Sequence, residues 1–223
     1  MIVAALAAPD RDSRLLDWLH IVDSSFPTGA YVHSAGLESL APLRLADLEE
    51  LLALRLQQTV GRFELVFLLH AYAVPLLPLN AQCHAMLLPR EAREASGQVG
   101  AQLLRNACDL FDHPRLAAFL RDGRHQHAPV VFGAVAAALD VARPVAAATY
   151  ALQGVRSLVA AAQRLTRLGQ RDAQRLVHRL KPAVREAVAT ASRLRLDEAG
   201  AFAPAWDVAA MAHERAPARM FVS

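Results

Sequence analysis

The sequence is poor in cysteine, glycine and aromatic residues. Its two cysteines, Cys83 and Cys108, cannot form a disulfide framework in 223 residues, and no CxxC spacing indicates structural zinc. Gly numbers 10, aromatics reach 6%, and Ala and Leu are conspicuous within the 54% hydrophobic residues. Strands prefer β-branched and aromatic side chains, whereas Ala and Leu cost little in a helix. The composition therefore predicts an all-α protein with a sizeable core.

No segment has the pattern of an export signal or a membrane span. The N-terminal stretch lacks a basic region and is too short to cross a bilayer. The apolar run from Leu65 to Leu79 is interrupted by His70, Pro75 and Pro78. We expect a cytoplasmic protein with no membrane association.

Apolar residues recur at three- and four-residue steps along most of the chain, which is the period of an α-helix. One stripe runs over 45–60, and another runs over 173–194 with Pro182 as an expected kink. No internal repeat or long linker divides the sequence. We predict a single-domain helical bundle over residues 1–223, with about eight to ten helices.

Glycine and proline mark the expected breaks between helices. Gly61 is expected to separate two helices, and Pro75 and Pro78 are expected to end regular structure after the second. Gly97 and Gly100 lie inside another predicted helix. They indicate either the close approach of a neighbouring helix or simple tolerance of glycine.

Basic residues are concentrated in one segment. Between Arg156 and Arg195 there are ten basic and two acidic residues, a net charge of +8, whereas the rest of the chain carries 14 basic and 19 acidic residues, a net charge of −5. Arg171, Arg175 and Arg179 step by four along one face of a predicted helix. Such a row can dock a carboxylate-rich or phosphate-bearing surface, or it is merely solvated. Nucleic-acid binding is a weaker alternative, because the expected stacking aromatics are missing.

Signatures of catalysis are missing. The sequence contains no GxxxxGK[ST] phosphate loop, no HExxH and no GxSxG. His125 and His127 can both reach a metal if they lie on a loop, but no third ligand stands near them in sequence. Cys83 and His84 form a similar adjacent pair, for which an exposed loop without a metal role is the favoured interpretation. We predict no metal site and no cofactor.

His213 and Glu214 are adjacent, and neighbouring residues on a helix point away from each other. A partner contact or a capping role is therefore favoured over proton transfer. One rival function remains, a small helical enzyme that uses His125, His127 and His213. It requires the three imidazoles to converge in one pocket.

Five segments carry the most specific patterns in the chain. DSSFPTGAYVHSAGLE, over 23–38, places a Pro-x-Gly-Ala-aromatic turn before a Ser-x-Gly-Leu-Glu helix start, where Ser34 is the expected N-cap. REAREASGQVGAQLL and HAPVVFGAVAAAL follow. QRLTRLGQRDAQRL contains Arg-Leu-x-x-Leu-Gly-Gln-x-x-x-Gln, and DVAAMAHERAPARMFVS ends the chain. In this order the segments resemble the UreF family of urease accessory proteins and cover nearly the whole chain.

The resemblance implies an all-α, non-catalytic protein that bridges the accessory protein UreD, also called UreH, and the GTPase UreG. Together they act on apo-urease to load its nickel centre. It also implies a homodimer within that complex and regulation of the GTP-linked nickel transfer. The missing phosphate loop agrees with this role, because the energy source would then belong to a partner.

Residues 215–223 are expected to form a partner-docking tail, with Phe221 as its buried anchor. The alternative is that Phe221 folds back on its own domain. Pro27 and Gly29 either contact a partner or only shape their turn.

Other matched positions are polar, and for them an interface or an internal path competes with hydrogen bonding inside the bundle. The expected partner-binding residues are Pro27, Gly29, Tyr31, Ser34, Glu38, Arg164, Gln170, Arg171, Gln174, Arg175, Arg179, His213, Glu214, Arg219, Phe221 and Ser223.

Overall fold

The computed structural model describes residues 11–30, 33–41, 44–216 and 219–222. This part of the chain is helical and contains no strand, which confirms the predicted all-α class. A π-helix (Leu56–Glu64) and a 3₁₀-helix (Leu196–Glu198) accompany the α-helices. The α-helices are α1 (Arg11–Ile21), α2 (Leu37–Leu40), α3 (Leu45–Arg55), α4 (Leu65–His70), α5 (Leu76–Met86), α6 (Arg90–Leu110), α7 (Pro114–Asp122), α8 (Ala128–Ala138), α9 (Arg143–Leu165), α10 (Gln170–Arg179), α11 (Lys181–Ala191) and α12 (Pro204–His213).

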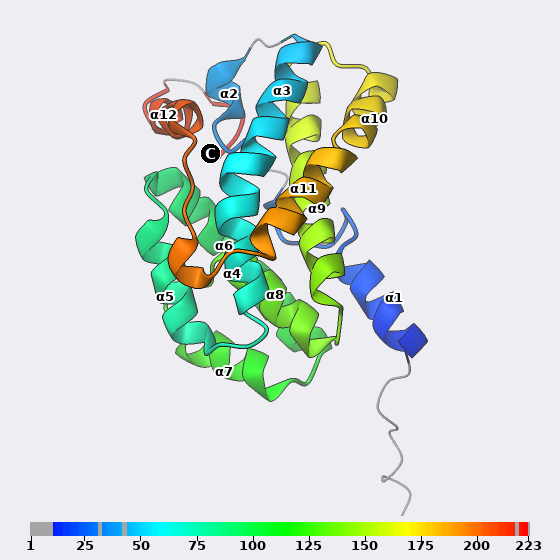
Figure 1. Ribbon diagram of the computed structural model, residues 1–223, viewed down its shortest axis with the longest axis vertical. Helices are drawn as coiled ribbons and strands as arrows, with labels where there is room; N and C mark the ends of the chain where they lie inside the picture. The colour runs from blue at the N-terminus through cyan, green and yellow to red at the C-terminus, as the bar shows by residue number, and fades with distance from the viewer. Residues whose placement is uncertain (1–10, 31–32, 42–43, 217–218, 223) are drawn as a thin grey trace, which may run out of the picture.

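Helix α8 lies at the centre of the core because its sequence is apolar on every side. Every residue of 129–136 is buried, and α4, α6 and α9 pack against the helix. A helix without a polar face is stable only when it is covered all round. Figure 1 shows α2 and α12 at one end of the bundle and α7 at the other.

Helix α9 is the one described helix whose length and apolar composition would allow it to cross a membrane. Eight of its residues are buried, and it packs against α4, α8, α10 and α11. Burial in the bundle accounts for its composition.

The prediction that Gly61 separates two helices is wrong. Helices α3 and α4 are joined without a break by the π-helix, and Gly61 lies inside it. A Cβ added at Gly61 would lie 2.9 Å from the Cα of Ala187 in α11. This glycine therefore lets α11 approach closely, a use of glycine that looks the same as a helix break in sequence.

The expectation for Pro75 and Pro78 is also wrong, because α5 begins directly after Pro75 and has Pro78 in its first turn. Proline is tolerated there, since the first amides of a helix have no intrahelical acceptor. Pro182 similarly stands in the first turn of α11, so the predicted stripe over 173–194 is divided between α10 and α11.

The two glycines of α6 have different surroundings. A Cβ at Gly100 would lie 1.9 Å from the carbonyl oxygen of Gln126, so the loop before α8 approaches the helix there. A Cβ at Gly97 would meet nothing within 4 Å. The close approach of the Gln126 backbone thus requires glycine at position 100, whereas Gly97 faces open space.

Alanine substitutions at these two positions are expected to have opposite effects on stability. Gly100→Ala must displace the Gln126 backbone and is expected to lower the free energy of unfolding by about 1–3 kcal/mol. Gly97→Ala adds helix propensity without a clash and is expected to raise it by about 0.5–1 kcal/mol. Urea denaturation followed by circular dichroism measures both, and equal effects would contradict the assigned contacts.

Candidate partner-binding site

The C-terminal segment lies against the protein's own helices. Phe221 is buried, 4% exposed, and the Arg164 guanidinium carbon lies 5.6 Å from the centre of its ring. Met220 and Val222 on either side of it are 62% and 57% exposed. Phe221 therefore faces the helices while both of its apolar neighbours face outward. The structure thus has the alternative arrangement, with Phe221 folded back on its own domain.

Glu38 of α2 holds this segment by its backbone. Its Oε1 accepts a hydrogen bond from the Met220 amide at 2.8 Å, and its Oε2 accepts one from the Phe221 amide at 3.1 Å. Hydrogen bonds from amides to an ionised carboxylate are stronger than those between neutral groups. One side chain near the N-terminus therefore fixes the course of the C-terminus.

His213 connects Glu38 to a second carboxylate. Its Nε2 lies 2.9 Å from Glu38 Oε2, and its Nδ1 lies 3.0 Å from Glu91 Oε2. The His213 side chain is 1% exposed, and that of Glu91 is 8% exposed. Arg219 Nη1 lies 3.0 Å from Glu91 Oε1. We call Glu38, Glu91, His213 and Arg219 the C-terminal cluster. It joins α2, α6, α12 and the chain end.

The segment before α2 is shaped so that α12 can reach the C-terminal cluster. Gly36 has φ 88°, and a Cβ added there would lie 2.9 Å from the Ala210 amide nitrogen in α12. Trp206 Nε1 donates a hydrogen bond to the Ala35 carbonyl. Gly36, not Ser34 as predicted, is the N-cap of α2. Ser34 is fully buried, and its hydroxyl accepts a hydrogen bond from the Glu38 amide at 3.5 Å.

The cluster makes the chain end sensitive to acid. Burial acts to raise the pKa of Glu38, but bonds from the Met220 amide, His213 and the Phe221 amide lower it below its usual 4.5. A lowered pKa stabilises the folded form above 4.5, and this contribution disappears as the pH falls through the folded-state pKa. The Met220 and Phe221 amide NMR signals are therefore expected to shift below pH 4.5. In Glu38→Gln this transition should be missing, and its persistence would contradict the assignment.

The turn at 23–30 has the conformation that its sequence predicts. Asp23 accepts hydrogen bonds from the Ser25 amide at 2.8 Å and the Ser25 hydroxyl at 2.5 Å. Gly29 has φ 76°, a conformation that favours glycine. The Pro27 carbonyl accepts a bond from Asn106 of α6 at 2.9 Å. These contacts support the turn-shaping role of Pro27 and Gly29. Tyr31 and Ser223 lie outside the described residues.

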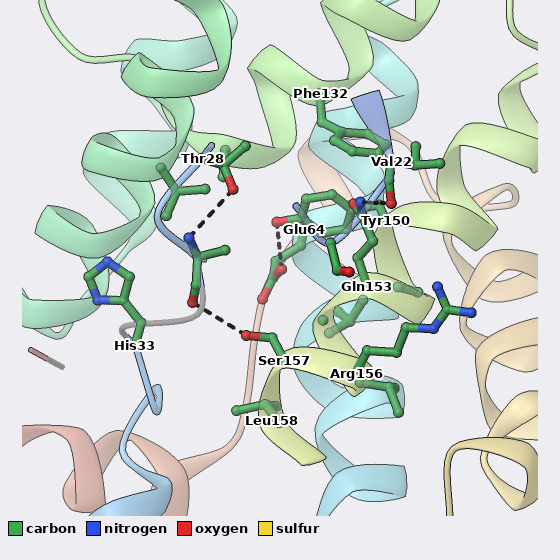
Figure 2. A pocket seen from close by; sticks show the side chains of 18 of the residues that line it. Val22, Thr28, His33, Glu64, Phe132, Tyr150, Gln153, Arg156, Ser157 and Leu158 are labelled. Atoms are coloured by element: carbon green, nitrogen blue, oxygen red, sulfur yellow. Dashed lines mark hydrogen bonds between the residues drawn. The ribbon is translucent and has the colours of Figure 1, made fainter. Parts of the chain in front are cut away.

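A cavity of about 350 Å³ lies between this turn and α9. In Figure 2, Tyr150 and Glu64 face each other in its wall, and the Tyr150 hydroxyl donates to Glu64 Oε2 at 2.9 Å. Arg55 pairs with Glu64 Oε1 at 3.2 Å. Burial, then the nearby Glu64, raises the pKa of Tyr150, so the phenol stays protonated as the donor. Sequence reasoning singled out none of these three residues, because 86 positions separate Glu64 from Tyr150.

The predicted residues of α10 form a separate, exposed surface. Arg175 lies 3.3 Å from Asp172, and Arg179 lies 2.8 Å from Glu49 of α3. Gln163 donates to Gln170 at 2.9 Å. Arg171 makes no ion pair with a described residue, and Gln174 is exposed. The row is thus on the surface, but two of its arginines are already paired.

The histidines of the rival enzyme hypothesis divide between two places. His125 stacks on His84 with ring centres 3.9 Å apart, and His84 Nδ1 lies 3.0 Å from His127 Nε2. His213 contacts neither His125 nor His127 and belongs to the C-terminal cluster. The convergence that this enzyme requires does not occur.

Sequence reasoning did not predict that His84 contacts His125 and His127. It placed Cys83 and His84 on an exposed loop, whereas both lie on α5 and Cys83 is fully buried. Burial raises the pKa of the Cys83 thiol, which opposes thiolate chemistry. In the described residues no group of three or more His, Cys, Asp or Glu is arranged to hold a metal ion.

The structure therefore brings together Ser34, Glu38, Arg164, His213, Arg219 and Phe221, with Glu214 nearby through an ion pair of 3.5 Å to Arg90. It sets apart the turn with Pro27 and Gly29 and the exposed face of α10. The fold and site define an all-helical protein in which half of the predicted partner residues that the structure describes gather around its own C-terminus.

Comparison with known proteins gives the family. The UreF family model matches residues 44–181, and the chain belongs to this family. It is 36% identical over 214 residues to the urease accessory protein UreF of Arthrobacter sp. (strain FB24), covering 91% of this chain and 94% of that relative. The same protein of Paenarthrobacter aurescens (strain TC1) is 35% identical, with 91% and 95% covered. That of Bacillus sp. (strain TB-90) is 28% identical, with 95% and 100% covered.

Proposed function

We propose that this protein is a non-catalytic scaffold of urease maturation in the cytoplasm. It bridges UreD (UreH) and the GTPase UreG on apo-urease, as a homodimer within the complex, so that nickel is inserted into the enzyme. Nickel is the cargo of this reaction. Family membership supports the assignment to urease maturation, and the surface around the C-terminus supports the bridging role.

The observation that carries the proposal is the exposure of four apolar side chains in α12 and at the chain end. Met220 and Val222 are exposed while Phe221 anchors the segment between them. Val208 and Met211 of α12 are 64% and 47% exposed and lie three positions apart, on one helix face. We call Val208, Met211, Met220 and Val222 the C-terminal surface. Its apolar side chains favour burial against a partner, and UreD is the proposed one.

Co-purification tests the scaffold directly. The chain is expected to capture UreD without nucleotide and to recruit UreG into the same complex, with GTP and nickel changing the yield of UreG. The purified chain alone is expected neither to hydrolyse GTP nor to convert a small molecule. Turnover by the pure chain, or no capture of UreD at physiological salt, would overturn the proposal.

The arginine row of α10 is proposed as a second docking surface. Replacing Arg171 and Arg175 with Glu is expected to weaken complex assembly by about tenfold or more, because both charges are exposed and their reversal repels an acidic partner. Arg179 is left unchanged because it pairs with Glu49 of another helix, α3, whereas Arg175 pairs with Asp172 of its own helix.

The matched control for that double variant is Arg62→Glu with Arg193→Glu. Both of these arginines are exposed and make no ion pair with a described residue, so the net charge changes equally. Pull-down of the complex and urease activity measure the effect. Normal activation in Arg171→Glu/Arg175→Glu would show that the row is only solvated.

A further inference from the structure

One face of α6 forms the floor of an open groove of about 1240 Å³. Arg90, Arg93, Gly97, Ala101 and Arg105 line it, at steps of three and four along about 22 Å of helix. The turn at 24–29 and the loop at 124–127, together with His84, complete its walls. An extended peptide of about six or seven residues spans the same length.

The groove carries an excess of positive charge. Its lining includes Arg90, Arg93, Arg105 and Arg124, and Glu94 is the one carboxylate among the described residues of the lining. Arg90 Nε pairs with Glu94 at 2.9 Å. The other three arginines make no ion pair with a carboxylate of the described residues. Arg93 donates to the carbonyls of residues 87 and 88 at the end of α5, at 2.6 Å each. Arg105 donates to Gln102 Oε1 at 2.8 Å. The charges of these three guanidinium groups are thus not neutralised by a described carboxylate and can attract an anionic ligand.

Two histidines beside the groove, His84 and His127, have lowered pKa values. Burial, then His84, His125 and Arg93, lowers the pKa of His127 to about 4. Burial, then His125 and Arg93, also lowers the pKa of His84. At neutral pH these two imidazoles are uncharged, so the arginines supply the positive field of the groove.

The floor of the groove is low at its middle. Gly97 has no side chain, and the space where its Cβ would stand is empty to 4 Å. A peptide backbone can therefore approach α6 between the arginines at either end. Among the described residues of the lining, Phe26 is the one Phe, Tyr or Trp, and at 7% exposure it offers no platform for stacked bases. These features favour a peptide over a nucleic acid.

We propose that this groove binds an extended acidic segment of a partner protein, with its carboxylates paired to Arg93, Arg105 and Arg124. This interaction goes beyond the scaffold function proposed above, because it uses neither the C-terminal surface nor the arginine row of α10. The chemistry identifies the ligand as a run of Asp or Glu in a flexible chain.

Fluorescence anisotropy with a labelled decapeptide of glutamate tests the proposal on the full chain. Saturable binding is expected at an ionic strength of about 0.01 M, and it should weaken at about 0.15 M because the paired charges are screened. A decaglutamine peptide is expected not to bind. Equal binding of both peptides would overturn the proposal.

Two variants locate the site. Gly97→Gln puts a side chain into the open groove and is expected to reduce affinity at least tenfold while preserving the fold. Gly154→Gln is the matched control, because Gly154 is also a helical glycine with open space around it, on α9. Arg105→Glu with Arg124→Glu is expected to abolish binding. Full affinity in both groove variants would overturn the proposal.

Two further measurements distinguish the groove from the α10 surface and a peptide ligand from a nucleic acid. Loss of binding only in Arg171→Glu/Arg175→Glu would place the ligand on α10 and overturn the groove. Tighter, Gly97→Gln-sensitive binding of a ten-nucleotide thymidine strand would overturn the choice of a peptide. Deletion of Arg219–Ser223 is expected to leave peptide binding unchanged, so failure of this proposal is distinguishable from failure of the scaffold function.

Discussion

Replacing His213 with alanine is expected to lower the free energy of unfolding by about 3–5 kcal/mol, because it leaves two carboxylates in the cluster without their shared partner. Both His213 nitrogens face a carboxylate oxygen, at 2.9 and 3.0 Å. The ring therefore contacts both Glu38 and Glu91, and Arg219 is the other group of the cluster that contacts Glu91. Chemical denaturation measures the loss.

A set of variants separates this electrostatic role from simple packing. His213→Gln retains a donor of similar reach and is expected to cost less than alanine. Adding Glu91→Gln to His213→Ala is expected to recover part of the loss, because the buried Glu91 carboxylate keeps only Arg219 as a partner in His213→Ala. His178→Ala, at an exposed histidine of α10, is the control and should change little. Equal losses in His213→Ala with and without Glu91→Gln would contradict the charge argument.

Much of the fold follows from local patterns that the sequence displays. The apolar stripes over 45–60 and 173–194 predict helices, and the structure has helices over most of both ranges. The errors fall where one residue type has two physical uses. Gly61 permits a close contact with Ala187 instead of a break, and Pro78 occupies the first turn of a helix instead of following one. Sequence spacing cannot separate these uses, because a helix packed against the residue decides between them.

The candidate site was only partly predictable for a related reason. The family resemblance selected Glu38, His213, Arg219 and Phe221 individually, but nothing in the spacing indicates that they meet. Glu38 and His213 are 175 positions apart, and Glu91, which completes the cluster, was not selected at all. Glu214, which was expected to point away from His213, pairs with Arg90. Contacts of this kind follow from the packing of α2, α6 and α12, which local patterns do not determine.

Deleting Arg219–Ser223 is expected to reduce capture of UreD by about a hundredfold while leaving helix content unchanged. Apolar residues at the centre of an interface contribute about 2–4 kcal/mol each when truncated, and the deletion removes Met220 and Val222 together with their anchor Phe221. The helices end before this segment, at His213, so circular dichroism should not register the loss. Titration of UreD in a quantitative pull-down measures the affinity.

The double variant Met220→Ser/Val222→Ser distinguishes direct contact from support by the anchor. It keeps Phe221 buried and leaves the backbone bonds to Glu38 in place, so thermal stability should match the parent chain. It is nevertheless expected to lose most of the affinity that the deletion loses, because both side chains belong to the exposed C-terminal surface. A deletion variant that captures UreD as well as the full chain would rule out the tail as a docking element. Loss in the deletion alone would assign the tail to holding α12 in place, with contact made by Val208 and Met211.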